Sequence, residues 1–273
     1  MANRIIDADG HICETKALWE EYVPRAYREQ TIRIERSADG QDRTWVNGVI
    51  REDLLPARAC VPNGMDDPDN PPTWSDITPG SHDGAARVAV LDEEGIERSL
   101  LFPSMYLLSG DIADVEVAAA ACHAYNEWIS DMCRDGSGRL DAVGLVPLQS
   151  VAAATKEVAH IAQLGLKGVL FRPERYNGLA LHDAALAPFW NAVADQGLFA
   201  AVHGSFGAHM PSFANSRYTD TFFTHMVCHP FEQMAACLDL VCGGVLQRHP
   251  GLRVAFLESG LGWLEYWLGR MDE

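Results

Sequence analysis

Two residues near the N-terminus, Asp9 and His11, stand two positions apart at the end of an apolar run. In extended backbone, residues i and i+2 point to the same side, so one carboxylate and one imidazole can reach a common ion. This pair of ligand types suits Zn²⁺, Mn²⁺ or Fe²⁺. The short spacing leaves a second interpretation open, in which Asp9-Gly10 forms a turn and His11 is an ordinary hydrogen-bonded residue.

Three further polar residues end apolar runs: Arg172 ends LKGVLFR, His203 ends LFAAVH and Glu258 ends RVAFLE. The carboxyl ends of parallel strands face the active site in α/β proteins, so these side chains are candidates for one site. His203 is the expected third metal ligand, unless it is only hydrogen-bonded at its strand end. Glu258 is a further ligand, a general base or a cap for the turn after it. Arg172 either binds a substrate carboxylate or pairs with Glu174.

Two more histidines, His225 and His229, are four positions apart. That spacing would place them on one helix face, as in some metal sites. However, Pro230 directly after His229 is typical of a helix start, which would leave His225 outside the helix. We therefore expect pocket roles: His229 as a catalytic residue with Glu258, and His225, with Arg172, in substrate binding.

Short apolar runs and longer helical stretches alternate along most of the chain. The runs typical of buried strands are 4–9, 98–103, 140–147, 166–172, 198–203 and 252–258. The stretches typical of helices are 114–134, 151–163, 183–196 and 231–248. This alternation predicts parallel strands in βαβ units.

Residues 30–85 interrupt the alternation and are interpreted as an insertion after the first strand, placed to cover the active site. TIRIERSADGQDRTWVNGVI predicts a hairpin, and the Pro-, Gly- and Asp-rich segment after it predicts a long loop. The first strand is not followed by a GxGxxG turn, which disfavours a dinucleotide-binding sheet. A (β/α)₈ TIM barrel fits better, although only six of its eight strands are recognisable.

Composition narrows the class of protein. The 273 residues include 38 Asp and Glu against 21 Lys and Arg, a formal net charge of −17. Such acidity argues against nucleic acid and anionic membranes as partners and leaves a small molecule as the expected one. The seven cysteines form no CxxC pair, no apolar run is long enough for a membrane span, and the N-terminus does not resemble a signal peptide. We therefore predict a cytoplasmic protein.

Five segments together resemble the amidohydrolase-related family of metal-dependent TIM-barrel enzymes. The branch of the family that they resemble contains aminocarboxymuconate-semialdehyde decarboxylase and the dihydroxybenzoate decarboxylases. The segments are IIDADGHICETKALWEEY, LDEEGIERSLLFPS, AYNEWISDMC with GRLDAVGLVPLQ, LGLKGVLFRP, and HPGLRVAFLESGLGWLEYWLGRMD. They run nearly end to end, so the resemblance predicts a single barrel domain over residues 1–273.

The resemblance implies one divalent metal, usually zinc, with manganese and iron as alternatives. Its ligands in the family are an acidic residue or His two positions before a His on strand one, a His on strand five and an Asp on strand eight. Matched residue by residue, it implies Asp9, His11 and His203 as ligands. The related decarboxylases place a His base at the end of strand six, where this chain has Glu258.

The strand-eight aspartate has no counterpart before the last residue, Glu273. We therefore expect either a shortened chain or a second subunit that covers the open side, and homo-oligomerisation follows from the unpaired strand edges. The first functional hypothesis is a metal-dependent hydrolase that attacks a small carboxylate-bearing or aromatic substrate with an activated water. The alternatives are a non-oxidative decarboxylase of an aromatic or enoic acid and a metal-poor, non-catalytic subunit.

Overall fold

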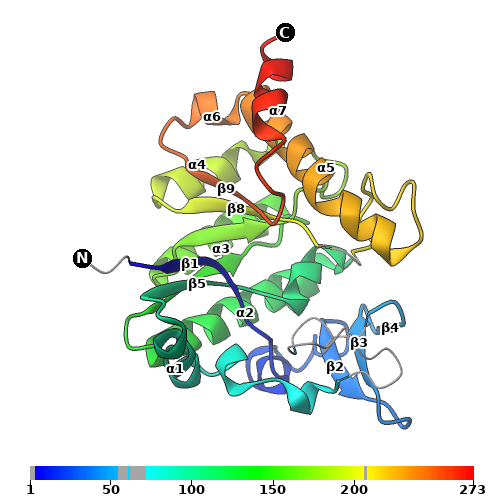
Figure 1. Ribbon diagram of the computed structural model, residues 1–273. Helices are drawn as coiled ribbons and strands as arrows, with labels where there is room; N and C mark the ends of the chain where they lie inside the picture. Colours follow the sequence, from blue (N-terminus) through cyan, green and yellow to red (C-terminus); the bar gives the residue numbers. More distant parts are fainter. Residues whose placement is uncertain (1–3, 55–60, 62–71, 206–207) are drawn as a thin grey trace.

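The computed structural model describes residues 4–54, 61, 72–205 and 208–273, and its central element is a curled sheet of six parallel strands (Figure 1). The strand order is β1-β5-β6-β7-β8-β9, which follows the chain apart from the insertion after β1. The strands are β1 (Ile6–His11), β5 (Arg98–Phe102), β6 (Leu140–Leu145), β7 (Gly168–Phe171), β8 (Phe199–His203) and β9 (Val254–Leu257). All six fall on predicted apolar runs. The arrangement is TIM-barrel-like, with six of the eight strands present among the described residues.

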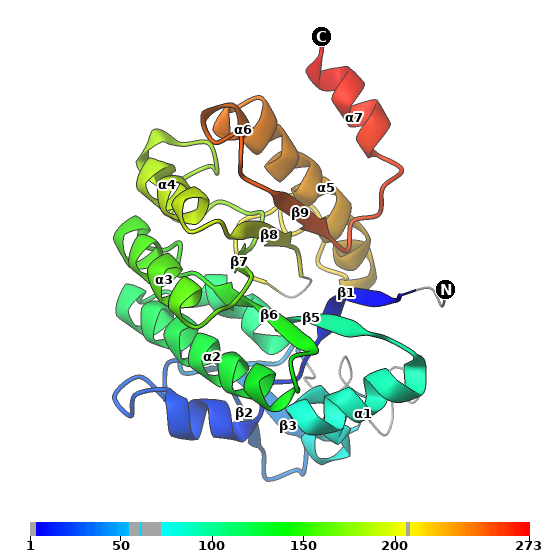
Figure 2. The same cartoon turned by 90° about the vertical axis from the view of Figure 1, so that its left-hand side faces the viewer.

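Helices cover the outer face of this sheet, where α2, α3 and α4 stand side by side (Figure 2). The α-helices are α1 (Gly84–Glu94), α2 (Val115–Asp135), α3 (Val151–Gln163), α4 (Ala187–Asp195), α5 (Thr221–Val241), α6 (Val245–Arg248) and α7 (Leu264–Met271). Short 3-10 turns are η3 (Trp74–Asp76), η4 (Pro79–Ser81), η5 (Met105–Asp111) and η6 (Ala184–Leu186), and η1 (Leu18–Tyr22) is a π-type turn. The N-cap side chains that accept backbone N–H groups are Asp83, Asp114, Ser150 and Asp220.

The core forms where the apolar stripes of the helices meet the sheet. Tyr125, Trp128 and Met132 recur at helical spacing on α2, and all three are buried in that core. The interior strands β6 and β7 are buried over nearly their whole length, as parallel strands covered on both faces should be. None of the helices in the described part of the chain is long and apolar enough to cross a bilayer.

The first strand is irregular beside Asp9. The pairing of β1 with β5 shifts register between Asp7 and Gly10, so the strand is bulged there. A Cβ at Gly10 would collide with the Asp7 carboxylate and the Ser99 hydroxyl, so any larger residue here would displace these two side chains. The bulge and this close approach shape the end of β1, where Asp9 and His11 lie.

The insertion after β1 contains a small antiparallel sheet of β2 (Arg33–Arg36), β3 (Asp42–Val46) and β4 (Val49–Arg51). The predicted hairpin is therefore confirmed, and β4 adds a strand that the sequence pattern did not predict. Asn47 and Gly48, with φ of 56° and 74°, make the tight turn between β3 and β4. The predicted long loop spans 61–84; residues 62–71 lie outside the described residues, and the described part contains the short turns η3 and η4.

The predicted start of the helix before β9 is wrong by ten residues. Helix α5 begins at Thr221 and contains Pro230, instead of beginning at Phe231. Asp220 caps the helix by accepting the N–H groups of Phe222 and Phe223, so the helix starts upstream and tolerates the proline inside it. His225 and His229 consequently lie one turn apart on the same helix, the arrangement that the proline had argued against.

Candidate metal centre

Four side chains converge at the carboxyl ends of the strands. Asp9 and His11 come from β1, His203 ends β8, and Glu258 follows β9. One ligand atom from each lies within 4.8 Å of the others. Within the cluster, His11 Nε2 is 3.2 Å from His203 Nε2 and 3.2 Å from Glu258 Oε1. Tertiary structure thus brings together residues that are up to 249 positions apart in the chain.

The two imidazoles are oriented as metal-binding histidines are. His11 Nδ1 is 2.8 Å from the carbonyl oxygen of Pro103, and His203 Nδ1 is 2.5 Å from the carbonyl oxygen of Gly204. An Nδ1–H that donates to a carbonyl leaves the Nε2 lone pair of a neutral ring free. The two Nε2 atoms therefore present lone pairs to the same point, which a cation would occupy favourably.

The Asp9 carboxylate supports the same interpretation. Its Oδ1 is buried and has no hydrogen-bond partner, yet it lies 3.9 Å from His11 Nε2 and 3.8 Å from His203 Nε2. A buried carboxylate oxygen without a donor is costly, and a bound cation would remove that cost. Burial raises the pKa of Asp9 to about 6, and the same cause lowers the pKa of His203 to about 4. The donor set fits a divalent ion of the zinc, manganese or iron type.

Glu258 reaches the cluster through an unusual backbone conformation. Its φ is 53°, in the left-handed region that costs a residue with a side chain about 1–2 kcal/mol. From there, Oε1 faces His11 and Oε2 lies 3.6 Å from His229 Nδ1. Without an ion, a protonated His11 Nε2 donates to Oε1, and this hydrogen bond is the main cause that lowers the pKa of Glu258 to about 2, so the group is a carboxylate over the ordinary pH range. A bound cation would replace that proton on Nε2.

A cavity of about 270 Å³ adjoins the cluster. It combines apolar residues with ionisable ones, and its lining residues are His11, Leu54, Ser104, Met105, Leu107, Leu108, Gly204, Ser205, His225, His229 and Glu258. His225 and His229 both face it from α5, with ring centroids 5.2 Å apart. Burial lowers the pKa of His229, which favours its neutral form. A small molecule with an apolar body and a polar end would fit such a cavity.

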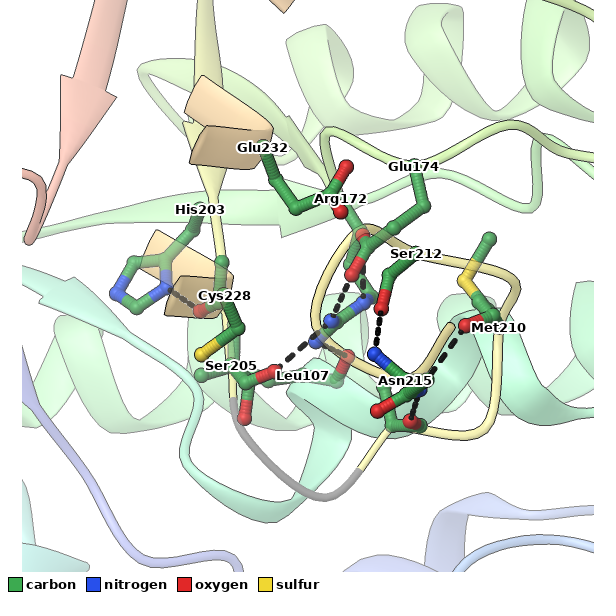
Figure 3. Close-up of polar contacts among 12 residues, drawn as sticks. Leu107, Arg172, Glu174, His203, Ser205, Met210, Ser212, Asn215, Cys228 and Glu232 are labelled. Carbon is green, nitrogen blue, oxygen red and sulfur yellow. Dashed lines mark hydrogen bonds and ion pairs between the residues drawn. The ribbon is translucent and has the colours of Figure 1, made fainter. Parts of the chain in front are cut away.

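Arg172 does not line this cavity. It is buried, and its Nε and Nη2 donate to the two carboxylate oxygens of Glu174, which is the ion pair that the sequence left open (Figure 3). Its other contacts are with backbone oxygens: Nη1 donates to Leu107 and Nη2 donates to Ser205. The His203 ring points away from this group (Figure 3). Arg172 therefore braces loops around the site, and the structure gives it no position from which to bind a substrate in this cavity.

Glu14 is a buried residue near the site that the sequence analysis missed. Its side chain is fully buried and accepts the backbone N–H groups of Ser104, Met105 and Tyr106. These residues directly follow Pro103, whose carbonyl orients His11. Glu14 thus ties the loop after β1 to the loop after β5. The sequence signal for it was weak, since a Glu three residues after a His is common in exposed turns.

Residues 6–272 match the amidohydrolase family, so this chain belongs to that family. The resemblance inferred from the sequence segments is confirmed. Among curated proteins, the chain is 23% identical over 200 residues to 2-amino-3-carboxymuconate-6-semialdehyde decarboxylase of Dictyostelium discoideum, covering 73% of this chain and 54% of that protein. The chain thus spans about half the length of this relative.

Solved structures share the fold. An amidohydrolase of Mycobacterium avium subsp. paratuberculosis K-10 matches with a TM-score of 0.78 at 21% identity, over 100% of this chain and 77% of that one. The 5-carboxyvanillate decarboxylase of Novosphingobium aromaticivorans, complexed with manganese and 4-hydroxy-3-methoxy-5-nitrobenzoic acid, matches with a TM-score of 0.65 at 16% identity, over 99% and 69% of the two chains. The comparisons therefore show that the chain belongs to the amidohydrolase family and shares the fold of these solved structures.

Proposed function

We propose that this chain carries the metal site of a hydrolase that acts on a small carboxylate-bearing or aromatic substrate. The observation that supports it best is the convergence of Asp9 Oδ1, His11 Nε2 and His203 Nε2 beside the cavity, with Asp9 Oδ1 buried and unpartnered. These three residues would hold the ion, and Glu258 would be a further ligand or a base. A divalent ion bound there would supply a Lewis acid that lowers the pKa of water and polarises a substrate oxygen.

The chain's own residues would then do the following work. Glu258, ionised and next to the cavity, accepts the proton of the attacking water and passes it to the leaving group. His229 orients Glu258 through the contact of its Nδ1 with Oε2, and His225 contacts the polar end of the substrate. Met105, Leu107 and Leu108 hold the apolar body. Because Leu54 lies three residues after the last strand of the small sheet and lines the cavity, we infer that the insertion covers the substrate within a single domain.

Decarboxylation is the second candidate, because the curated relative and the manganese-bound structure are both named decarboxylases. In that reaction a C–C bond breaks, CO₂ leaves with no electrons from that bond, and the remaining carbon takes a proton. Glu258 is a carboxylate and has no proton to give, so the proton would have to come from His229, whose lowered pKa disfavours the protonated form. We rank hydrolysis first because Glu258 stands where the related decarboxylases have a histidine base.

The test combines metal content with turnover. Protein purified without added metal, then loaded with Zn²⁺ or Mn²⁺, is assayed on a panel of carboxylate-bearing amides, esters and lactones and on hydroxybenzoates, with CO₂ release recorded in parallel. We expect close to one ion per chain at this site and metal-dependent turnover that falls at least 100-fold in His203→Ala. CO₂ release without hydrolysis would favour the second candidate. A metal-free chain with no turnover would favour the third hypothesis, a non-catalytic subunit.

A further inference from the structure

A second cluster of metal-type side chains lies on the outer side of the sheet, between α2 and α3. His123 and Glu127 are one turn apart on α2, and His160 lies on α3. One ligand atom from each of the three lies within 4.8 Å of the others. The rings of His123 and His160 stack, with centroids 4.2 Å apart and an interplanar angle of 26°. None of the three lines the cavity described above.

Within this cluster, the buried His160 Nε2 makes no hydrogen bond. His160 Nε2 lies 2.9 Å from Glu127 Oε1, but the nitrogen is buried and the pair is not aligned for a hydrogen bond. Glu157 Oε2 lies 3.3 Å from His123 Nδ1. Two carboxylates therefore stand beside two imidazoles, an arrangement that attracts a cation and suits a borderline metal better than Ca²⁺ or Mg²⁺.

We propose that His123, Glu127 and His160 form a second divalent-metal site that binds Zn²⁺. Two imidazoles and one carboxylate are an established zinc donor set, with water in the fourth position. Glu157, outside the three ligands, orients His123 as a carboxylate partner. This proposal does not depend on the proposed function, because no residue is shared between the two sites.

The site would link two helices to the sheet. Asn126, on α2, donates to Glu157 and to the carbonyl oxygen of Leu145 at the end of β6, and its own oxygen accepts the N–H of Leu145. An ion held by His123 and His160 would therefore fasten α2 to α3 directly above this buried network. Binding to the folded chain alone would raise its thermal stability in proportion to the zinc concentration.

The experiment uses the full chain with His203→Ala, which removes a ligand of the first site. Zinc sulfate is titrated into this protein by calorimetry, and thermal unfolding is followed with and without zinc. We expect one equivalent of zinc to bind and the midpoint of unfolding to rise. Adding His160→Ala should weaken binding at least tenfold and abolish the rise in the midpoint. Adding His249→Ala, at a histidine that belongs to neither cluster, should change neither result.

Two results would overturn the proposal: no zinc bound by the His203→Ala chain, or equal affinity after His160→Ala is added. Failure of the first site alone is distinguishable, because wild-type and His203→Ala chains would then bind the same single equivalent. If His160→Ala fails to fold by circular dichroism, Glu127→Gln serves instead, since this side chain is partly exposed and its loss should also weaken zinc binding at least tenfold.

Discussion

Asp9 has a buried carboxylate oxygen, Oδ1, that accepts no hydrogen bond. We predict that Asp9→Asn lowers the affinity for zinc at the first site by about 100-fold or more, because the substitution removes the charge that the cation would neutralise and even outer partners of metal ligands are worth about 10–100-fold. Competition with a chromogenic chelator measures the change.

Asp7→Asn is the matched control on the same strand. The Asp7 carboxylate accepts the Ser99 hydroxyl at 2.6 Å and lies 3.6 Å from the Arg87 guanidinium. Its Oδ1 also accepts the backbone N–H of Asp9, a contact that the asparagine oxygen can keep. This variant should be less stable and should bind zinc as wild type does. Equal zinc affinity in the Asp9→Asn variant and the wild type would contradict the assignment of Asp9 as a metal ligand.

Glu232 gives a pH-dependent prediction. Burial raises its pKa to about 7, from an unfolded value near 4.5. Between these two values the folded chain keeps a proton that the unfolded chain has released, so stability is highest below pH 4.5 as far as this group is concerned and falls as the pH rises to 7. The loss is on the order of 3 kcal/mol.

Glu232→Gln removes this titration while its side-chain oxygen can still accept the N–H of Phe213, which Glu232 accepts in the structure. We expect the variant to exceed wild type in stability at pH 8 and to converge with it near pH 5. Urea unfolding at pH 5, 6, 7 and 8 measures both curves. Parallel curves for the two proteins would show that Glu232 is already ionised without penalty.

At the scale of elements, the loops after β1 and β5 act as one unit because Glu14 joins them. We predict that Glu14→Gln destabilises the fold by about 1–3 kcal/mol, since an amide NH₂ would face backbone donors. It should also weaken zinc binding by about tenfold, because Pro103 would hold His11 less firmly. Glu20→Gln, at a half-exposed glutamate on η1, is the control and should change neither quantity. Chemical unfolding and chelator competition provide the two measurements.

At the scale of the whole molecule, α5 and α7 carry exposed apolar side chains. They include Phe222, Phe223 and Met226 on α5, and Tyr266 and Leu268 on α7. Helix α7 buries none of its residues and projects from the body of the chain in both views (Figures 1 and 2). Exposed apolar patches of this kind mark association surfaces. The homo-oligomer expected from the sequence stays a prediction with this added support.

Light scattering tests it. We expect a mass of at least twice the 30.0 kDa of one chain at micromolar concentration. The double variant Phe222→Ser with Tyr266→Ser should shift the mass down toward that of one chain. A monodisperse monomer at 100 µM would contradict self-association. The cytoplasmic location and the absence of nucleic-acid and membrane partners rest on composition and also stay predictions.

Local sequence patterns were sufficient to predict the six strands and the polar residues at their ends. Buried parallel strands are short continuous apolar runs, so all six were visible without tertiary information, and a polar residue that ends such a run is conspicuous. His203 and Glu258 were found in this way, as was the pair Asp9 and His11. The helix positions on α2 and α3 followed from caps and periodicity, which are local properties.

Which of these side chains are in contact became known only from the folded chain. Local signals could not choose between two partners for Arg172, and burial beside Glu174 decided it. A proline appeared to start a helix at His229, but the stronger cap at Asp220 extends α5 and aligns His225 with His229. Glu14 and the pair His123 and His160 make contacts between segments that are distant in the chain, so their roles could not be predicted from local sequence. Contacts between residues distant in the chain are set by packing of whole elements, and no short sequence window contains that information.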